Sequence, residues 1–398
     1  MIAIPWFFAR EGQLETFIWF FIATNVLALF WVPYAGTIID KYDRKVVFQL
    51  TNLFSGILLG IICYIGYMQE GLTLNMVALV FVLTFMNYSI HYPNLYAFVQ
   101  EITPQKMYGK ITSILEIQGQ ATGILGGVFA VLLLEGSKNG SIEILGIKIN
   151  LFRSFKSWEM YEIFLLDALT YIASFLLISA ISFIALTDRK EENTNIINRL
   201  KIGLGFLNKN RTTFLFGVIS YFIFVAVILE GFYLGADYVS NHLNESGGVY
   251  ASSDIAYSAG AMISGVFIRT IFKRVNIPAA LIILTLITSA LFFVLFASNS
   301  NILFYIMLFI LGLTNAGSRI LRVTYLFNNV PNQVYGRAAS IFNICNILVR
   351  ILLLLLFSLS FFEQSNNVVY AFLTLSLFLL LTAGVMLANY KKFDLKIY

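Results

Sequence analysis

Apolar runs of about 20 residues recur from one end of this chain to the other. Each run is long enough to cross a hydrocarbon core of roughly 30 Å as an α-helix. Only 12% of the 398 residues are charged and the mean hydropathy is +0.81, which is too apolar for a water-soluble domain. Lipid cannot satisfy exposed backbone groups, and the alternating pattern of a barrel is absent. The runs therefore predict an all-α polytopic membrane protein.

The pattern predicts an odd number of full spans, eleven, preceded by an apolar stub at 1–9 that is too short to cross a bilayer. The predicted spans are 14–39, 46–68, 74–100, 109–135, 161–187, 212–236, 250–271, 277–298, 301–328, 336–362 and 367–390. The loop segment 142–150 alternates like a small β-hairpin near the membrane surface.

The distribution of lysine and arginine predicts the orientation. Of 26 basic residues, eighteen fall in the set of loops that begins with 40–45, five in the opposite set, and three inside spans. Because basic loops stay in the cytoplasm, the 36–45 turn, the central segment and the C-terminus are predicted to be cytoplasmic. The formal charge of +5 is thus explained by topology, and no nucleic-acid partner is expected.

Cysteine and histidine are too few for a metal or redox centre. Cys63 and Cys345 lie inside apolar segments, and the only histidines are His91 and His242. We therefore expect no metal and no cofactor. A membrane enzyme, such as a lipid or sugar transferase, would need clustered acids and histidines in a long surface loop, and none is present. We expect that the protein is not an enzyme.

The chain contains an internal repeat. The segment from Pro104 to Ile114 reappears from Pro331 to Ile341 with proline, tyrosine, glycine, serine and isoleucine all matched at an offset of 227 positions. The polar segment 188–211 divides the chain near its middle and has room for a short amphipathic helix. These features predict two helical halves, 1–187 and 212–398, joined by a cytoplasmic linker at 188–211.

The turn after the first full span carries a distinctive motif, in which Gly36, Asp40, Arg44 and Lys45 are spaced by four, four and one. It resembles the signature between helices 2 and 3 of the major facilitator superfamily of secondary transporters, and the 104–110 and 331–337 turns resemble its loops 4–5 and 10–11. The Ile4-Pro5-Trp6 start and the form of the turn are most similar to the bacterial multidrug, macrolide and siderophore exporters.

This resemblance implies the major facilitator fold, with two pseudo-symmetric halves in the bacterial cytoplasmic membrane. The expected function is proton-coupled efflux (antiport) of a small organic compound, drug-like or siderophore-like, by a monomer working through alternating access. An importer of a small solute and a degenerate, non-transporting family member are the alternatives.

The position of the motif implies one departure from the family. If 36–45 joins helices 2 and 3, then 14–39 is helix 2 and 1–9 is only the end of helix 1. We expect that the first helix is truncated here, and that the natural gene product is longer or its start misassigned.

The resemblance also implies a conformational gate. In this signature the acid faces the start of helix 11, which places Asp40 near Gly336 and Arg337. A carboxylate there meets the positive end of a helix dipole, which contributes about 0.3–1 kcal/mol, and the contact would hold the two halves closed on the cytoplasmic side. The predicted gate comprises Gly36, Asp40, Arg44, Lys45, Gly336 and Arg337.

Family helices 1, 4, 7 and 10 line the central cavity. The polar residues that fall on the last three in this chain are Asn87, His91, Glu230, Asn315, Arg319 and Arg322. Arg319 and Arg322, three apart on one helical face, could bind an anionic or carbonyl-rich ligand or form a structural pair bonded to backbone carbonyls. His91 beside Pro93 is interpreted as a satisfied histidine at a kink rather than a proton relay.

Proton coupling requires a carboxylate in a changing environment. Glu116 and Glu230 are the candidates, with Asp167 weaker. Asn343, Asn346 and Arg350 form a polar stripe deep in the eleventh helix of the family numbering, and the repeat offset maps them onto Glu116, Gly119 and Gly123. We interpret this stripe as an inter-half latch or cavity wall in preference to a direct ligand site.

Overall fold

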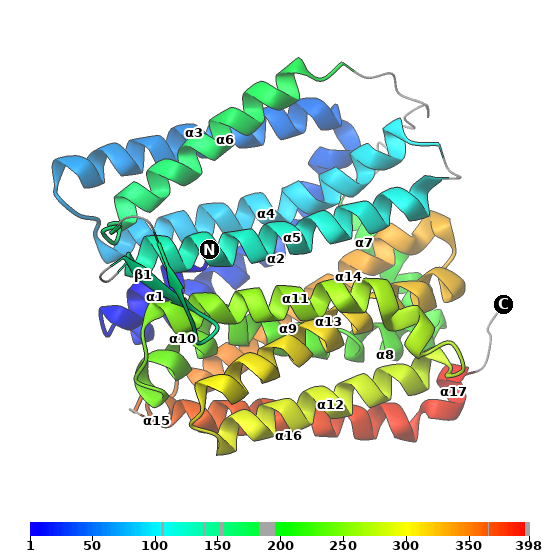
Figure 1. Cartoon of the computed structure of the whole chain (residues 1–398). Helices are drawn as coiled ribbons and strands as arrows, with labels where there is room; N and C mark the ends of the chain where they lie inside the picture. The colour runs from blue at the N-terminus through cyan, green and yellow to red at the C-terminus, as the bar shows by residue number, and fades with distance from the viewer. Residues whose placement is uncertain (105–106, 138–139, 152–153, 183–195, 365, 395–398) are drawn as a thin grey trace.

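The protein is a bundle of long, nearly parallel helices with a small hairpin at one end (Figure 1). The computed structural model describes residues 1–104, 107–137, 140–151, 154–182, 196–364 and 366–394. Among these residues, ten helices are long and apolar enough to cross a membrane, which confirms the all-α polytopic fold. The predicted span 250–271 is also a long helix, but its serines, glycines and aspartate make it less apolar than those ten.

The first part of the chain forms six helices and the hairpin. Their bounds are α1 (Ala3–Arg10), α2 (Leu14–Lys41), α3 (Arg44–Met68), α4 (Leu74–Ile102), α5 (Tyr108–Glu135), β1 (Ser141–Ile144), β2 (Ile147–Asn150) and α6 (Met160–Ala180). The helix starts follow from capping chemistry, because the Asp43 side chain accepts from the Val46 N–H and the Thr73 hydroxyl from the Met76 N–H.

The rest of the chain begins with α7 (Ile196–Lys209), a helix within the predicted linker, whose residues 188–195 lie outside the described part. The next span is one continuous helical stretch, made of α8 (Arg211–Ile219), α9 (Phe222–Leu229), the π-helical turn η2 (Glu230–Leu234), α10 (Gly235–Asp237) and the π-helical turn η3 (Tyr238–His242). The remaining helices are α11 (Gly247–Ile271), α12 (Ile277–Ala297), α13 (Asn301–Asn329), α14 (Asn332–Phe357), α15 (Ser360–Glu363), α16 (Val368–Ala388) and α17 (Tyr390–Asp394).

Two pairs of helices form the outer edges of the bundle, and two further pairs join the predicted halves. The pair α3 and α6 lies along one edge of the bundle and the pair α12 and α16 along the opposite edge (Figure 1). Between them, α5 packs along α11 and α2 packs along α14. In the family numbering, α5 is helix 5 and α14 is helix 11. Each of these two helices therefore contacts the other half, as expected for an inter-half position. The domain boundaries themselves stay a prediction.

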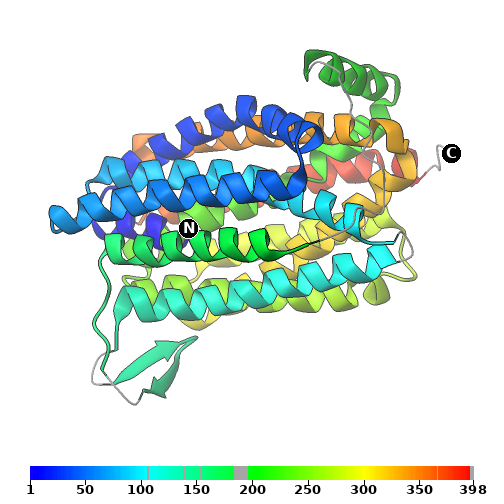
Figure 2. The same cartoon turned by 90° about the horizontal axis from the view of Figure 1, so that it is seen from above.

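The two ends of the bundle differ, as Figure 2 shows. One end carries α1 and the β-hairpin, and we call it the hairpin end. The other carries the turn between α2 and α3, helix α7 and the C-terminus, and we call it the linker end.

The predicted hairpin at 142–150 is confirmed. Strands β1 and β2 pair antiparallel, with Ser141 opposite Asn150 and Ile144 opposite Ile147. The two turn residues, Leu145 and Gly146, both have positive φ, 54° and 79°, as a tight two-residue turn requires. The backbone N–H of Leu145 donates to the Ser252 hydroxyl of α11 at 3.3 Å, so the hairpin from the first half is fastened to the second.

Candidate functional site

An acidic cluster lies between the helical stretch Arg211–His242 and α11. Glu230 is 3% exposed and begins the π-helical turn η2, a type of helix irregularity that is frequent at functional sites. Its carboxyl folds toward Gly235, where an added Cβ would stand 2.8 Å from Oε1. Tyr250 of α11 closes the same space and donates its hydroxyl to the Gly231 carbonyl at 2.6 Å.

Asp254, one turn along α11 from Tyr250, completes the cluster. It lies within electrostatic reach of Glu230, and Tyr257 one turn further lies within reach of both carboxyls. Tyr257 accepts from the Asn315 amide at 2.6 Å. Among the described residues, neither carboxyl has a hydrogen-bond or ion-pair partner. Like charges at close range repel, and one proton on either carboxyl removes that repulsion.

The acidic cluster confirms that Glu230 lies inside the bundle and adds a residue that the sequence analysis missed. Asp254 is the only acidic residue in α11. An ionisable group inside a span is by default a functional candidate, so its position in the predicted span 250–271 was a usable signal. Asn315 and the exposed Arg319 of α13 reach the same region through Tyr257.

A buried cation lies on α14. Arg350 is 4% exposed, and its guanidinium stands 5.5 Å from the ring centre of Phe85 on α4. Among the described residues it has no hydrogen bond and no ion pair. A desolvated cation–π contact contributes about 2 kcal/mol, whereas burying an ion costs several kcal/mol. Phe85 therefore does not compensate the buried charge.

Asn346, one turn before Arg350 on the same face of α14, is also unsatisfied. It is 2% exposed, and neither its amide nitrogen nor its carbonyl oxygen has a partner. A buried amide without hydrogen bonds is uncommon and costs about 1–3 kcal/mol. Arg350 and Asn346, which we call the Arg350–Asn346 pair, thus present unused donors at the contact between the halves.

Aromatic side chains from both halves close the bundle toward the hairpin end. Phe21 of α2 and Phe81 and Phe85 of α4 surround Phe232 of η2, with ring centres 6.0, 6.0 and 6.4 Å from it. Closer to that end, Trp6 of α1 stacks on Tyr250 of α11 at 6.1 Å. These contacts join the two halves on the side where α2 and α4 begin.

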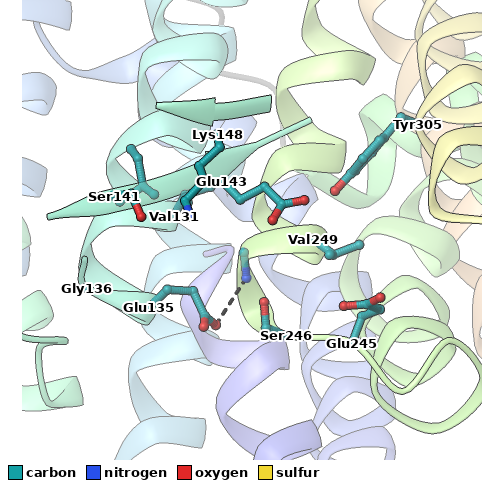
Figure 3. Close-up of a pocket in the computed structure, with 12 residues that line it drawn as sticks. Val131, Glu135, Gly136, Ser141, Glu143, Lys148, Glu245, Ser246, Val249 and Tyr305 are labelled. Atoms are coloured by element: carbon teal, nitrogen blue, oxygen red, sulfur yellow. Dashed lines mark hydrogen bonds between the residues drawn. The ribbon is translucent and has the colours of Figure 1, made fainter. Parts of the chain in front are cut away.

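A cavity of about 330 Å³ lies at the hairpin end, between the hairpin and the starts of α11 and α13 (Figure 3). Its walls carry Glu135, Glu143 and Glu245, and Lys148 projects from β2. The Glu135 carboxylate accepts from the Gly248 N–H at 3.1 Å, at the start of α11, where the helix dipole favours an anion. This contact is a second closure between the halves.

The seam between α5 and α11 is tight near the hairpin end and looser at Gly119. A Cβ on Gly127 would stand 2.6 Å from Ile255, and one on Gly123 would stand 2.5 Å from the Ser258 hydroxyl. One on Gly119, the next residue of the same stripe, would meet nothing within 4 Å. The close packing of α5 on α11 thus includes Gly127 and Gly123 and does not extend to Gly119.

The two candidates on α4 lie within the first half. Asn87 donates to the Ser55 hydroxyl of α3 at 3.1 Å, and His91 packs edge-on against Phe48 of α3 at 5.3 Å. Both side chains thus face α3 rather than α13, and the structure does not bring them together with Asn315 and Arg319.

Arg322 has the structural arrangement that the sequence left open as an alternative. It is 3% exposed, donates to the Ser220 carbonyl at 2.9 Å and stacks on the Tyr221 ring at 3.8 Å. Its guanidinium therefore ties α13 to the end of α8, inside the second half.

The predicted gate residues hold neighbouring helix ends. Arg44 pairs with Glu101 of α4 at 3.0 Å, and Lys45 donates to the Ile181 carbonyl after α6 at 2.7 Å. The Asp40 side chain lies outside the described residues, although the residue itself is in α2. Gly36 has open space around it.

The other side of the predicted gate packs on the linker helix. A Cβ on Gly203 of α7 would stand 2.7 Å from the Arg337 carbonyl oxygen, and Gly336 beside it is exposed. Asn343 is half-buried on α14. The side chain of Glu116, the other coupling candidate, lies outside the described residues.

Helices that are long enough to cross a bilayer and that bury ionisable side chains such as Glu230, Arg322 and Arg350 are typical of a membrane transporter. The chain belongs to the Major Facilitator Superfamily, whose sequence profile matches residues 1–354. It is therefore a membrane transporter of that family. The family match does not distinguish among branches of the superfamily, so the assignment to the exporter branch stays a prediction.

Solved structures with the same fold have little sequence in common with the chain. The nucleoside transporter NupG is 14% identical, with 98% of this chain and 94% of that chain covered and a TM-score of 0.63. A D-xylose–proton symporter is 11% identical, with 94% and 87% covered and a TM-score of 0.67. A bacterial homologue of the iron transporter ferroportin in an outward-facing state is 13% identical, with 97% and 98% covered and a TM-score of 0.56. A comparison with curated protein sequences found no match.

Proposed function

We propose that the protein is a proton-coupled secondary transporter that exports a small organic compound by alternating access. The observation that carries this proposal is the acidic cluster, in which the buried Glu230 and the half-buried Asp254 interact electrostatically and have no basic partner among the described residues. Export, rather than import, rests on the resemblance of the 36–45 turn to the exporter branch.

The coupling step uses the two carboxyls as one proton site. When both are ionised their repulsion is at its largest, and a proton on either carboxyl relieves it. Tyr250 and Tyr257 place hydroxyl groups beside the carboxyls and so provide a path for the proton. Antiport requires that the cluster takes up its proton on one side of the membrane and releases it on the other, in alternation with the substrate. Glu116 remains a second coupling candidate.

Access alternates between the two ends. Phe232 in its aromatic surround and the Glu135–Gly248 contact close the hairpin end in this conformation. The basic loops predict that the linker end is cytoplasmic, so the looser packing of α5 on α11 at Gly119 is consistent with an inward opening. In the opposite conformation, Asp40 would reach the start of α14 near Gly336 and Arg337.

The setting follows from the same reasoning. The protein is proposed to lie in the bacterial cytoplasmic membrane as a monomer with a cytoplasmic C-terminus, with the lipid bilayer, protons and its substrate as partners.

The test is transport by the purified chain in liposomes with an imposed pH gradient. A panel of amphipathic drugs and siderophore-like chelators is supplied, and proton flux is followed with an internal pH dye. The wild-type chain should couple flux of at least one compound to proton movement in the opposite direction. Glu230→Gln should lower gradient-driven transport at least tenfold while leaving exchange without a gradient measurable.

Asp237→Asn is the matched control. Asp237 is a second buried carboxyl on the same span, but it has its own partner, because the Asn241 amide donates to it at 2.8 Å. This variant should transport within twofold of wild type. Gradient-driven transport that persists in Glu230→Gln, Glu116→Gln and the double variant would refute the proton site. Uptake along the proton gradient would refute export.

A further inference from the structure

We infer that Arg350 and Asn346 form a binding subsite for the anionic group of an aromatic substrate, a carboxylate, phosphate or sulfonate on an aryl ring. The inference rests on the proposed transport function and names the class of its substrate. It concerns the Arg350–Asn346 pair on α14, which shares no residue with the acidic cluster.

The first observation is the absence of a counter-charge. Arg350 is buried at 4% exposure, and the Nε atom is unpaired. Within the described part of the chain the ion pairs are Arg10–Glu11 and Arg44–Glu101, and neither involves Arg350. An ionised side chain inside a membrane protein normally has a partner or faces a cavity that admits one.

The second observation is independent of the charge. Asn346 is 2% exposed and lies four residues before Arg350, so both side chains leave the same face of the helix. Its amide nitrogen and carbonyl oxygen are both without partners. A planar guanidinium matches the two oxygens of a carboxylate or phosphate, and the amide of Asn346 can donate to the same group. The unused donors are therefore those that an oxyanion requires.

The third observation concerns the wall that faces this pair. The ring centre of Phe85 lies 5.5 Å from the guanidinium carbon of Arg350. The ring centres of Phe21 and Phe232 each lie 6.4 Å from that of Phe85. Four phenylalanines meet at this point when Phe81 is included, at 6.0 Å from Phe85. Aromatic rings bind another ring by offset or edge-on packing. A ligand with an aryl ring and an oxyanion would satisfy both parts of the site.

A purely structural latch explains these contacts less well. The other buried arginine with a ring contact, Arg322, also donates to a backbone carbonyl, which is how a structural arginine is satisfied. Arg350 has the ring contact without the hydrogen bond. Phe85, the ring that Arg350 faces, also belongs to the aromatic group around Phe232 that joins the two halves.

The test measures binding without a pH gradient, so it is independent of proton coupling. The purified full chain is placed in phosphatidylcholine nanodiscs with 2-naphthoate, 2-naphthyl phosphate or 2-naphthalenesulfonate, and with neutral 2-naphthamide for comparison. At least one anion should bind at least tenfold more tightly than the amide. Arg350→Gln should abolish that preference, and Arg350→Lys, which keeps the charge, should retain part of it.

Three controls keep the test decisive. Arg10→Gln removes a surface arginine that is half exposed and paired with Glu11, and it should bind the anions as wild type does. Arg350→Met should unfold in the absence of ligand at a temperature equal to or above that of wild type, because it removes an uncompensated buried charge. Replacing the lipid by phosphatidylglycerol should change the anion affinity by less than twofold.

Four outcomes would overturn the inference. They are binding of none of the three anions by the wild-type chain, equal binding of anion and amide, unchanged anion preference in Arg350→Gln, and a clearly lower unfolding temperature for Arg350→Met. A tenfold loss of affinity in phosphatidylglycerol would also overturn it, because a lipid headgroup would then be the occupant.

Discussion

The two halves of the bundle use their polar residues differently, although the repeat at 104–114 and 331–341 relates them in sequence. In the first half, Asn87 and His91 are engaged with α3, and the surface turned toward the second half is aromatic. In the second half, Glu230 and Asp254 remain unpartnered among the described residues and face the interior. Pseudo-symmetry of the fold therefore does not carry over to chemistry. Around Phe232, among the described residues, the first half supplies a wall of aromatic rings, whereas Glu230 and Asp254 come from the second half.

The largest effect on transport is expected from polar residues of the second half, and little effect from those of the first. Asp254→Asn, like Glu230→Gln, should lower gradient-driven transport at least tenfold, and the double variant should be no worse than either single one, because the two carboxyls act as a unit. Asn87→Ala and His91→Ala should stay within about threefold of wild type, a difference of roughly 0.6 kcal/mol, since their contacts lie inside the first half. Equal losses on both sides would contradict the division of roles. The measurement is proton flux in liposomes.

The next effect concerns the seam between the halves. Gly127→Leu should force α5 away from Ile255 and the Ala251 carbonyl, and overpacking of this kind costs about 1–3 kcal/mol. Gly126→Leu is the matched control, because a Cβ at Gly126 meets nothing within 4 Å. We expect a lower midpoint of thermal unfolding in detergent, or greater labelling of a cysteine introduced at Ser252, for the first variant only. If both variants behave alike, the seam is not the contact that closes the hairpin end.

A smaller effect tests the first half alone. Arg44→Gln breaks the ion pair with Glu101, whose side chains are only 20% and 11% exposed, and removes the bond to the Ala97 carbonyl. Removing one partner of such a pair leaves a part-buried carboxylate, which should cost about 1–3 kcal/mol of stability. Arg10→Gln breaks an exposed pair and should change stability by less than about 0.5 kcal/mol. Thermal unfolding in detergent measures both, and a similar shift in the two variants would argue against a structural role for the 36–45 turn.

The smallest effect is expected at the hairpin. Glu135→Gln keeps the shape of the side chain but removes the charge that meets the start of α11, which is worth about 0.3–1 kcal/mol. Glu143→Gln, on the same cavity, has no such helix end and serves as the control. Cysteine accessibility at the hairpin end should rise slightly in the first variant only. A larger change in the second would assign the closure to the hairpin itself.

Much of the fold could be predicted from the sequence. The apolar runs correspond to the helices from α2 to α16, and the alternating segment 142–150 corresponds to the hairpin. The motif at Gly36–Lys45 and the repeat pointed to the family that the sequence profile then showed. These features are local, since each depends on residues close together in the chain.

The site was predicted less completely, and the residues show why. The sequence indicates Glu230, but it does not single out Asp254, which lies among serines, alanines and tyrosines that match no known site. Asn87, His91 and Arg322 lie on the helices that line the cavity in the family, yet all three have partners on neighbouring elements. Residue type and helix number do not reveal which face of a helix carries a side chain.

The sequence alone determined that the chain is a helical membrane bundle with a basic side and two related halves. The reason is that a bilayer permits few structures and that lysine and arginine in short loops set the side of the membrane on which each loop lies. Only the tertiary structure decided which polar side chains would find partners. It pairs Arg44 with Glu101 and places Arg322 on the Ser220 carbonyl, while Arg350 and Asn346 remain unpartnered. Hydrogen bonds and ion pairs act over a few ångströms between residues that are distant in the chain, so packing, not sequence, determines which of them form.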